Sequence, residues 1–197
     1  VIGENGSGKT TLIRLIAGIY PLTKGSIKAN KNAKITPIFA VKAGINPLFT
    51  GYENIFILGS MYGMTKSQID NKMSFIEEFS GLGNRLLAPS GNYSSGMKAR
   101  LGYSVAAATD PDLFIVDEAL AVGDIAFRKK CFENLKTITR EEGKSVLFVT
   151  NNNLKLEKIA NRVLIMKEGH VVRNSYNIID TMNFYTSSEY SNLKITQ

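Results

Sequence analysis

Apolar positions recur with two different periods along the chain, and the changes between them divide it into three stretches. At the start, Val1-Ile2 is typical of the end of a buried strand, and helical spacing over Thr10–Ile19 follows a glycine-rich turn. From Thr50 to Asp110 the spacing is helical. After it, Leu113–Val116 is a continuous apolar run of the kind found in strands buried on both faces of a parallel sheet. The pattern predicts an α/β fold with a mainly parallel sheet and a helical insertion at about residues 48–110.

Local signals set the bounds of several elements. Thr50 with Glu53, and Thr65 with Gln68, have the spacing of capping boxes, and each pair marks a helix start. The other predicted elements are short strands and turns over 22–41, a loop over 88–93, a helix over about 94–106, a helix over 125–142, a strand over 145–150, a short helix over 154–160, a hairpin over 162–173 and a last helix over 178–185. We expect residues 1–197 to form one such domain, lacking its N-terminal strands.

Residues 3–10, Gly-Glu-Asn-Gly-Ser-Gly-Lys-Thr, fit the phosphate-binding pattern GxxxxGK[ST] at every fixed position. Glycines let backbone N–H groups curl around a phosphate, Lys9 reaches the β- and γ-phosphates, and the Thr10 hydroxyl ligates Mg²⁺. An accidental glycine turn would not need the strand before it and the helix after it. The candidate nucleotide-binding residues are Gly3, Glu4, Asn5, Gly6, Ser7, Gly8, Lys9, Thr10 and Thr11. The motif leaves the class open, because GTPases, kinases, helicases and transporters share it.

The apolar run Leu113–Val116 ends in two carboxylates, Asp117 and Glu118. Asp117 can hold Mg²⁺ through water, and Glu118 can orient and polarise an attacking water. Alone, a core strand that ends in acidic residues is common. About a hundred residues after a phosphate-binding loop, it is interpreted as the Walker B strand of an ATPase.

Residues 93–97, Tyr-Ser-Ser-Gly-Met, precede this strand by about one helix and resemble the signature motif of ABC transporter ATP-binding subunits. The match is a variant, because Ser95 and Met97 replace the family's first glycine and its glutamine. In the family this motif opens a helix whose N-terminus contacts the γ-phosphate of ATP held by the opposite subunit, which suits the positive end of a helix dipole. The resemblance therefore implies that Ser94, Ser95 and Gly96 complete a nucleotide site across a dimer.

Three longer stretches, residues 46–55, 92–97 and 120–124, resemble one branch of this family, the exporters of polysaccharide, O-antigen and teichoic acid. The first looks like the Pro-x-x-Thr-Gly-x-Glu-Asn segment of that branch, in the loop and helix that face the membrane subunit. The resemblance extends from Gly3 to about Tyr185. It implies a P-loop NTPase fold of the ABC ATPase type, in which Asp124 bridges two subunits.

The resemblance also implies a function. The chain would be an ATP-binding and ATP-hydrolysing subunit that uses Mg²⁺. It would form a homodimer, or a heterodimer with another ABC subunit, with composite ATP sites. Glu118 would be the base, and dimer closure would drive a separate integral-membrane permease. The exported molecule would be a lipid-linked glycan, and the subunit would lie peripherally on the cytoplasmic face of the plasma membrane.

Two positions depart from the family pattern. Asn151 stands where the family has its switch histidine, and an asparagine amide can donate a hydrogen bond to phosphate but cannot titrate. Ala40 aligns with a Gln or Glu near the Mg²⁺, and the lone histidine, His170, is expected to be a surface residue. A degenerate ATP-binding module with little hydrolysis of its own, regulating a partner ATPase, is the alternative. A soluble ABC ATPase acting on DNA or ribosomes ranks last, since no long coiled-coil insertion is present.

Composition bears on three further questions: nucleic-acid binding, disulfide formation and membrane spans. The formal net charge is +7, but the basic residues are scattered and form no arm for nucleic acid, so we expect no nucleic-acid partner. Cys131 is the single cysteine, so no disulfide can form within the chain. No apolar stretch approaches the roughly 18 residues needed to span a bilayer, so a membrane link would depend on a partner.

Overall fold

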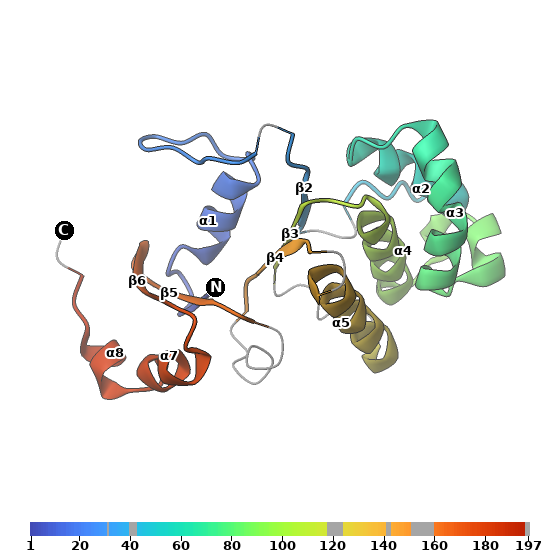
Figure 1. Cartoon of the computed structure of the whole chain (residues 1–197). Coiled ribbons are helices and arrows are strands. Elements are labelled where there is room, and N and C mark those ends of the chain that lie inside the picture. Colours follow the sequence, from blue (N-terminus) through green and yellow to red (C-terminus); the bar gives the residue numbers. More distant parts are fainter. Residues whose placement is uncertain (31, 40–42, 118–123, 141–142, 151–159, 196–197) are drawn as a thin grey trace. The chain divides into compact units, whose positions relative to one another are not determined.

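The computed structural model describes residues 1–30, 32–39, 43–117, 124–140, 143–150 and 160–195 (Figure 1). The chain forms two compact units, one of Val1–Asn30 with Leu147–Gln197 and the other of Lys31–Val146. None of the helices in the described ranges is both long and apolar enough to span a lipid bilayer. Each unit has its own three-stranded sheet, and the two are described in turn.

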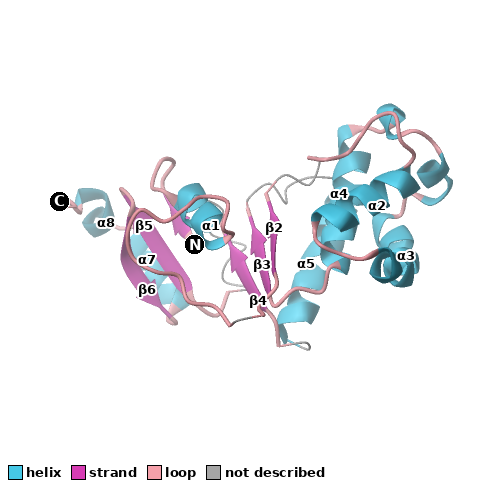
Figure 2. Cartoon of the chain, turned by 90° about the horizontal axis from the view of Figure 1, so that it is seen from above, coloured by secondary structure: helices cyan, strands magenta, loops and turns pink. Residues whose placement is uncertain are grey.

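The first unit contains a sheet in which the order of strands is β1, β5, β6 (Figure 2). Strand β1 (Ile2–Gly3) runs parallel to β5 (Val163–Lys167), which forms an antiparallel hairpin with β6 (His170–Ser175). The predicted hairpin is therefore confirmed. Ile2 and Ile165 face each other across the parallel pair and are fully buried, so the start of the chain is fixed to a segment more than 160 residues away.

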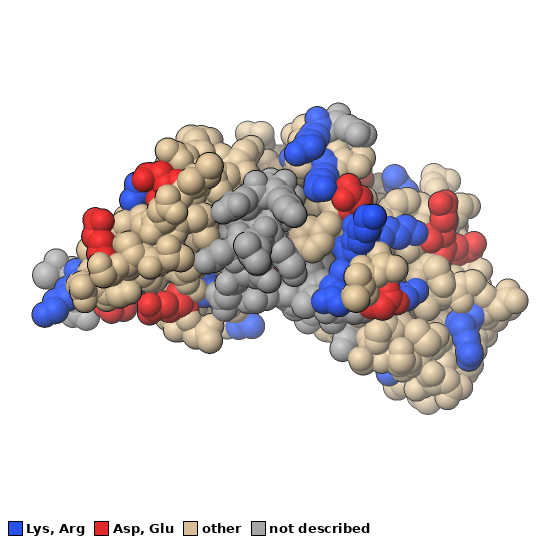
Figure 3. Space-filling view, turned by 90° about the horizontal axis from the view of Figure 1, so that it is seen from below, with Lys and Arg blue, Asp and Glu red and all other residues tan. Residues whose placement is uncertain are grey.

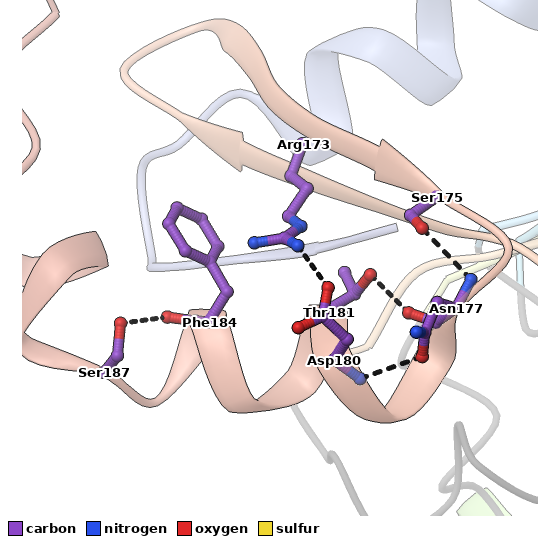
Figure 4. Close-up of polar contacts among 7 residues, drawn as sticks. All are labelled: Arg173, Ser175, Asn177, Asp180, Thr181, Phe184 and Ser187. Atoms are coloured by element: carbon purple, nitrogen blue, oxygen red, sulfur yellow. Dashed lines mark hydrogen bonds and ion pairs between the residues drawn. The ribbon is translucent and has the colours of Figure 1, made fainter.

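The described residues of this unit also form the helices α1 (Lys9–Ile16), α7 (Ile178–Tyr185) and α8 (Ser188–Asn192). Helix α7 confirms the predicted last helix. Figure 4 shows how its start is fixed: the Asn177 side chain accepts a hydrogen bond from the Asp180 N–H at 3.1 Å, and Arg173 of β6 pairs with the Asp180 carboxylate. Helix α8 was not predicted from the sequence. It begins after Ser187, whose hydroxyl accepts the Tyr190 N–H at 3.3 Å.

The other sheet contains strands β2 (Ile35–Ile38), β3 (Leu113–Val116) and β4 (Ser145–Phe148) in that order; β2 and β3 belong to the second unit, and β4 begins there and continues into the first along the chain. Strands β2 and β3 are parallel, and the last three residues of β3 are buried, as the apolar run predicted. The expectation of several short strands over 22–41 was wrong for the described residues, which form β2 alone. Residues 21–30 are all exposed, and a strand without a buried face has little to stabilise it.

Helices α2 (Gly51–Met61), α3 (Lys66–Ser80) and α4 (Ser95–Ala108) share a core with the 3₁₀ turn η1 (Gly83–Leu87). Both predicted capping boxes are confirmed, since Thr50 and Thr65 each exchange hydrogen bonds with the third residue that follows. Most of α4 is buried, which explains why its polar residues are not gathered on one side of the helix. The unit also contains η2 (Ser90–Asn92) and α5 (Ile125–Arg140). The predicted end of α5 at Glu142 and the predicted helix over 154–160 lie outside the described residues.

Basic and acidic side chains are interspersed over the surface. On the face drawn in Figure 3, Lys and Arg stand in several separate groups, with Asp and Glu among them. The net charge of +7 is therefore not gathered into one continuous basic patch on this face.

Candidate nucleotide-binding site

The segment Gly3–Thr10 runs from the end of β1 through a tight loop, residues 4–8, into the first turn of α1. Gly6 and Gly8 have positive φ values of 83° and 97°, a conformation that only glycine adopts without strain. A Cβ atom on Gly3 would lie 2.3 Å from the Met166 carbonyl oxygen, and one on Gly8 would lie 3.3 Å from the Gly169 Cα. Glycine is therefore required both by the curl of the loop and by its close contact with the β5–β6 hairpin.

The turn of the hairpin also holds the loop through a hydrogen bond. The Gly169 N–H donates to the Ser7 carbonyl oxygen at 3.0 Å, and Gly169 itself has a φ of 81°. The sequence predicted the hairpin but not this contact, so the part that Met166 and Gly169 play in holding the phosphate-binding loop was missed. A turn signal at Lys167-Glu168-Gly169 was visible, yet nothing in one sequence indicates which distant segment a turn will contact.

Replacing Gly3 by Ala is expected to destabilise the full-length protein by about 1–3 kcal/mol for the extra volume forced into a packed site, on top of the backbone strain at its positive φ of 154°. The added methyl group would meet a backbone carbonyl that cannot move without separating β1 from β5. Gly6→Ala is the matched control, because a Cβ there meets nothing within 4 Å and brings only the left-handed strain of about 1–2 kcal/mol. Urea unfolding of both variants measures the difference. Equal losses would show that the contact with Met166 is unimportant.

Lys9 begins α1, and its side chain curls back over the loop. Its Nζ donates hydrogen bonds to the carbonyl oxygens of Gly3 and Glu4 at 2.7 and 2.8 Å, and only 8% of the residue is exposed. Gly8, at the N-cap, has no side chain to cap the first turn, in which Thr10 and Thr11 are exposed. The N–H groups of this turn and the Lys9 cation therefore lie at the same end of the helix, an arrangement that favours an anion.

The hydroxyl of Ser7 provides an independent test of what the loop can hold. Ser7 is 4% exposed, and within the described residues its Oγ is a buried polar atom without a hydrogen-bond partner. A buried hydroxyl is costly to leave unpaired. Together with the left-handed glycines and the cation of Lys9, it fits the oxygen-rich phosphate chain of a nucleotide.

Of the Walker B and hydrolysis residues, Asp117 lies within the described ranges. Asp117 directly follows β3 in the second unit, and it is partly buried. Glu118, Ala40 and Asn151 lie outside the described residues. The structure thus brings together the nine loop and helix residues of the first unit, whereas the roles of Glu118 and Asn151 stay predictions from the sequence.

The signature residues lie at the start of α4 in the second unit. Ser94 is the N-cap, and its Oγ accepts a hydrogen bond from the Met97 N–H at 3.2 Å. Ser94 and Ser95 are exposed and Gly96 is partly exposed, whereas most of the helix behind them is buried. The exposed part of this helix is therefore its positive, N-terminal end.

Asp124 makes contacts with nearby residues of its own chain. Its Oδ1 accepts the Phe127 N–H at 2.8 Å at the start of α5, and its other oxygen pairs with Arg100 of α4. The Phe127 N–H, followed by Arg100, lowers the pKa of this carboxyl below its usual value. Within one chain, Asp124 joins α4 to the start of α5. Its predicted contact with a second subunit stays a prediction.

Comparisons with known proteins agree on the family. The family model described as "ABC transporter" matches residues 1–121. The chain is 39% identical over 171 residues to the teichoic acids export ATP-binding protein TagH of Shouchella clausii, covering 87% of the chain and 46% of that protein. It is 39% identical over 173 residues to the O-antigen export system ATP-binding protein RfbB of Klebsiella pneumoniae, covering 88% of the chain and 69% of that protein. The chain thus spans about half the length of the first relative.

The fold has solved counterparts. A dimeric ATP-binding cassette, MJ0796, described as a post-hydrolysis state bound to ADP and Pi, superposes with a TM-score of 0.70 at 22% identity. The match covers 88% of this chain and 82% of that one. At this identity the likeness concerns the fold, and it supports the predicted α/β class with its P-loop.

Proposed function

Because the chain belongs to the ABC transporter family, as its motifs predicted, we propose that it is the ATP-binding and ATP-hydrolysing subunit of an exporter of cell-surface polysaccharide. The teichoic acid and O-antigen export proteins support this branch, each at 39% identity. The observation that carries the nucleotide part is the loop before α1. There, left-handed Gly6 and Gly8, the Lys9 cation and the buried Ser7 hydroxyl converge on one helix N-terminus.

Each residue of the site has a role in this proposal. Lys9 and the N–H groups of the loop bind the phosphates of ATP, and Glu118 accepts the proton of the attacking water. Thr10 and Asp117 would hold Mg²⁺, which neutralises the charge that develops on the phosphates. Asn151 would donate a hydrogen bond to the γ-phosphate in place of the family's histidine.

A dimer would complete the nucleotide site. The exposed, positive end of α4 offers Ser94, Ser95 and Gly96 to an anion outside its own chain. We propose that this anion is the γ-phosphate held by the loop of a second subunit, with Asp124 at the dimer interface. The dimeric state of the solved cassette MJ0796 supports such an arrangement.

Exposed apolar residues support contact with a membrane permease. Leu48 is 82% exposed and Leu87 is 69% exposed, and a bridge between Thr50 and Pro89 joins the loops that carry them. Exposed apolar side chains mark a docking surface where they gather into one patch, and the bridge brings the segments that follow Leu48 and Leu87 side by side. We propose that the permease docks here and that the subunit lies on the cytoplasmic face of the membrane.

Cells depleted of the full-length protein are expected to lose polysaccharide from their surface and to retain lipid-linked glycan inside. The physical reason is that a permease without ATP-driven closure has no energy source for export. Lectin or antibody labelling of intact and of lysed cells measures both pools, and the wild-type gene should restore the parent pattern. An unchanged surface pool would rule out the export function. Tight ATP binding without turnover by the purified protein would favour the degenerate regulatory module.

A further inference from the structure

Asn54, in the first turn of α2, is a fully buried polar residue to which sequence analysis gave no role of its own. Four acceptors lie within hydrogen-bond distance of its Nδ2 and share its two N–H donors: the carbonyl oxygens of Asn46, Phe49 and Thr50 at 3.0, 3.1 and 2.8 Å, and the Ser90 Oγ at 3.1 Å. Its Oδ1 accepts the Asn46 N–H at 2.7 Å. One side chain therefore fixes both ends of the loop 46–50 and reaches a residue 36 positions further along the chain.

Ser90 is the second half of this connection, and it is also fully buried. Its Oγ donates to the Asn46 carbonyl oxygen at 2.8 Å, and its N–H donates to the Phe49 carbonyl oxygen at 2.8 Å. The next residue, Gly91, donates its N–H to the Pro47 carbonyl oxygen at 2.8 Å. The loop 46–50 and the segment 90–91 are thus joined by backbone and side-chain hydrogen bonds. The two side chains at the centre, Asn54 and Ser90, are fully buried, and buried hydrogen bonds are the stronger ones.

The segment after Ser90 connects directly to α4, the helix that begins with the signature residues. Residues 90–92 form the turn η2, and Tyr93 is 6% exposed, with its hydroxyl donating to the Arg85 carbonyl oxygen at 2.6 Å. Ser94, the N-cap of α4, follows at once. Only three residues, all in or beside a fixed turn, separate Ser90 from Ser94.

We propose that Asn54 is a positioning residue that makes the loop 46–50 and the start of α4 move as one body. This inference rests on the proposed function, in which the loop faces a permease and α4 faces ATP. Leu48, within the loop, is 82% exposed and so free to contact a permease, whereas Asn54 is fully buried. Movement of α4 on ATP would then be passed to the permease through the Asn54–Ser90 connection.

Two variants weaken the connection at different points. Asn54→Asp keeps the shape and the acceptor for the Asn46 N–H, but it replaces the amide N–H donors by a buried oxygen that faces four other oxygens. Ser90→Ala removes one hydroxyl and is the milder change. Their matched controls are Asn71→Asp, an exposed residue of α3, and Ser80→Ala, a buried serine whose hydroxyl donates to the Glu77 carbonyl oxygen.

Hydrogen exchange on the full-length protein, with and without ATP–Mg²⁺, tests the coupling directly. In the parent and both controls, ATP should change exchange in residues 88–94 and in residues 46–50 together. In Asn54→Asp and Ser90→Ala the change at 88–94 should persist, while that at 46–50 falls by roughly 3- to 30-fold, the range for weakening a coupling element. If Asn54 had only a structural role, the variants would change hydrogen exchange equally in both segments without ATP, and ATP would still change exchange in both segments together. That outcome overturns the inference.

Transport by the full-length protein assembled with its permease in lipid vesicles provides the second measurement. The glycan moved per ATP hydrolysed should fall by a similar factor in both variants, whereas ATP affinity should stay at the parent value. If the parent transports and the variants keep the parent ratio, Asn54 does not couple the two segments. If the parent itself hydrolyses ATP but moves no glycan, the proposed export function fails, and the inference about the permease fails with it.

Discussion

Replacing Glu118 by Gln is expected to lower the rate of ATP hydrolysis by roughly 100- to 10,000-fold, the usual contribution of a general base. Glutamine keeps the shape of the side chain and can still orient water, but it cannot accept a proton at neutral pH. ATP affinity should be unchanged, because the phosphates are held by the loop before α1. Steady-state phosphate release and equilibrium ATP binding, measured on the same full-length protein, separate the two effects.

Glu133→Gln is the matched control for this substitution. Glu133 is an exposed residue of α5 that pairs with Lys136 on the same helix, so the loss of its charge should leave hydrolysis at the parent rate. Parent-level hydrolysis by Glu118→Gln would show that the base lies elsewhere. If the parent binds ATP but does not hydrolyse it, Asn151→His becomes the informative variant. A gain of turnover there would identify the chain as a degenerate module.

The elements that the sequence predicted well are those whose signals are local. A capping box lies within four residues, so Thr50 and Thr65 could be assigned from spacing alone, and both are confirmed. Strand β3 was equally clear, because a strand buried on both faces is apolar at every position. The β5–β6 hairpin was indicated by the turn that contains Gly169. Glycine has no Cβ and therefore adopts the positive φ of such a turn without strain, whatever lies around it.

The features that could not be predicted depend on contacts between distant segments. The Gly169 N–H reaches Ser7 across more than 160 residues, and Asn54 reaches Ser90 across 36. Periodicity reports which face of an element is buried, but not what covers it. The same reason explains the error over 22–41: the turn residues were recognised, but whether residues 22–30 pair with another strand depends on distant segments, and within the described residues they form no strand.

Asp124 illustrates how a family resemblance and a structure address different questions. The resemblance assigns it to an interface between two subunits, and the structure shows its contacts within one. Because its carboxylate already accepts the Phe127 N–H and pairs with Arg100, its position is fixed before any dimer forms. A residue held in this way loses less conformational entropy on binding a partner. The two roles are therefore compatible.

Replacing Lys9 by Ala is expected to weaken ATP binding by roughly 10- to 150-fold, the equivalent of the 1.5–3 kcal/mol for a hydrogen bond to a charged group. Two losses act together. The phosphates lose their cation, and the carbonyl oxygens of Gly3 and Glu4 lose the donor that holds them in the curled loop. Titration with ATP by calorimetry, at fixed Mg²⁺ and on the full-length protein, measures the change.

Lys9→Arg separates the charge from the geometry in this prediction. Arginine keeps the positive charge, but its planar, longer group cannot replace a compact ammonium that contacts two carbonyl oxygens 2.7 and 2.8 Å away. We therefore expect Lys9→Arg to weaken ATP binding nearly as much as Lys9→Ala. Lys34→Ala, at an exposed lysine of the second unit, controls for the general loss of one positive charge. If Lys9→Arg bound ATP like the parent, charge alone would be sufficient, and the fit of the ammonium in the loop would be unnecessary for phosphate binding.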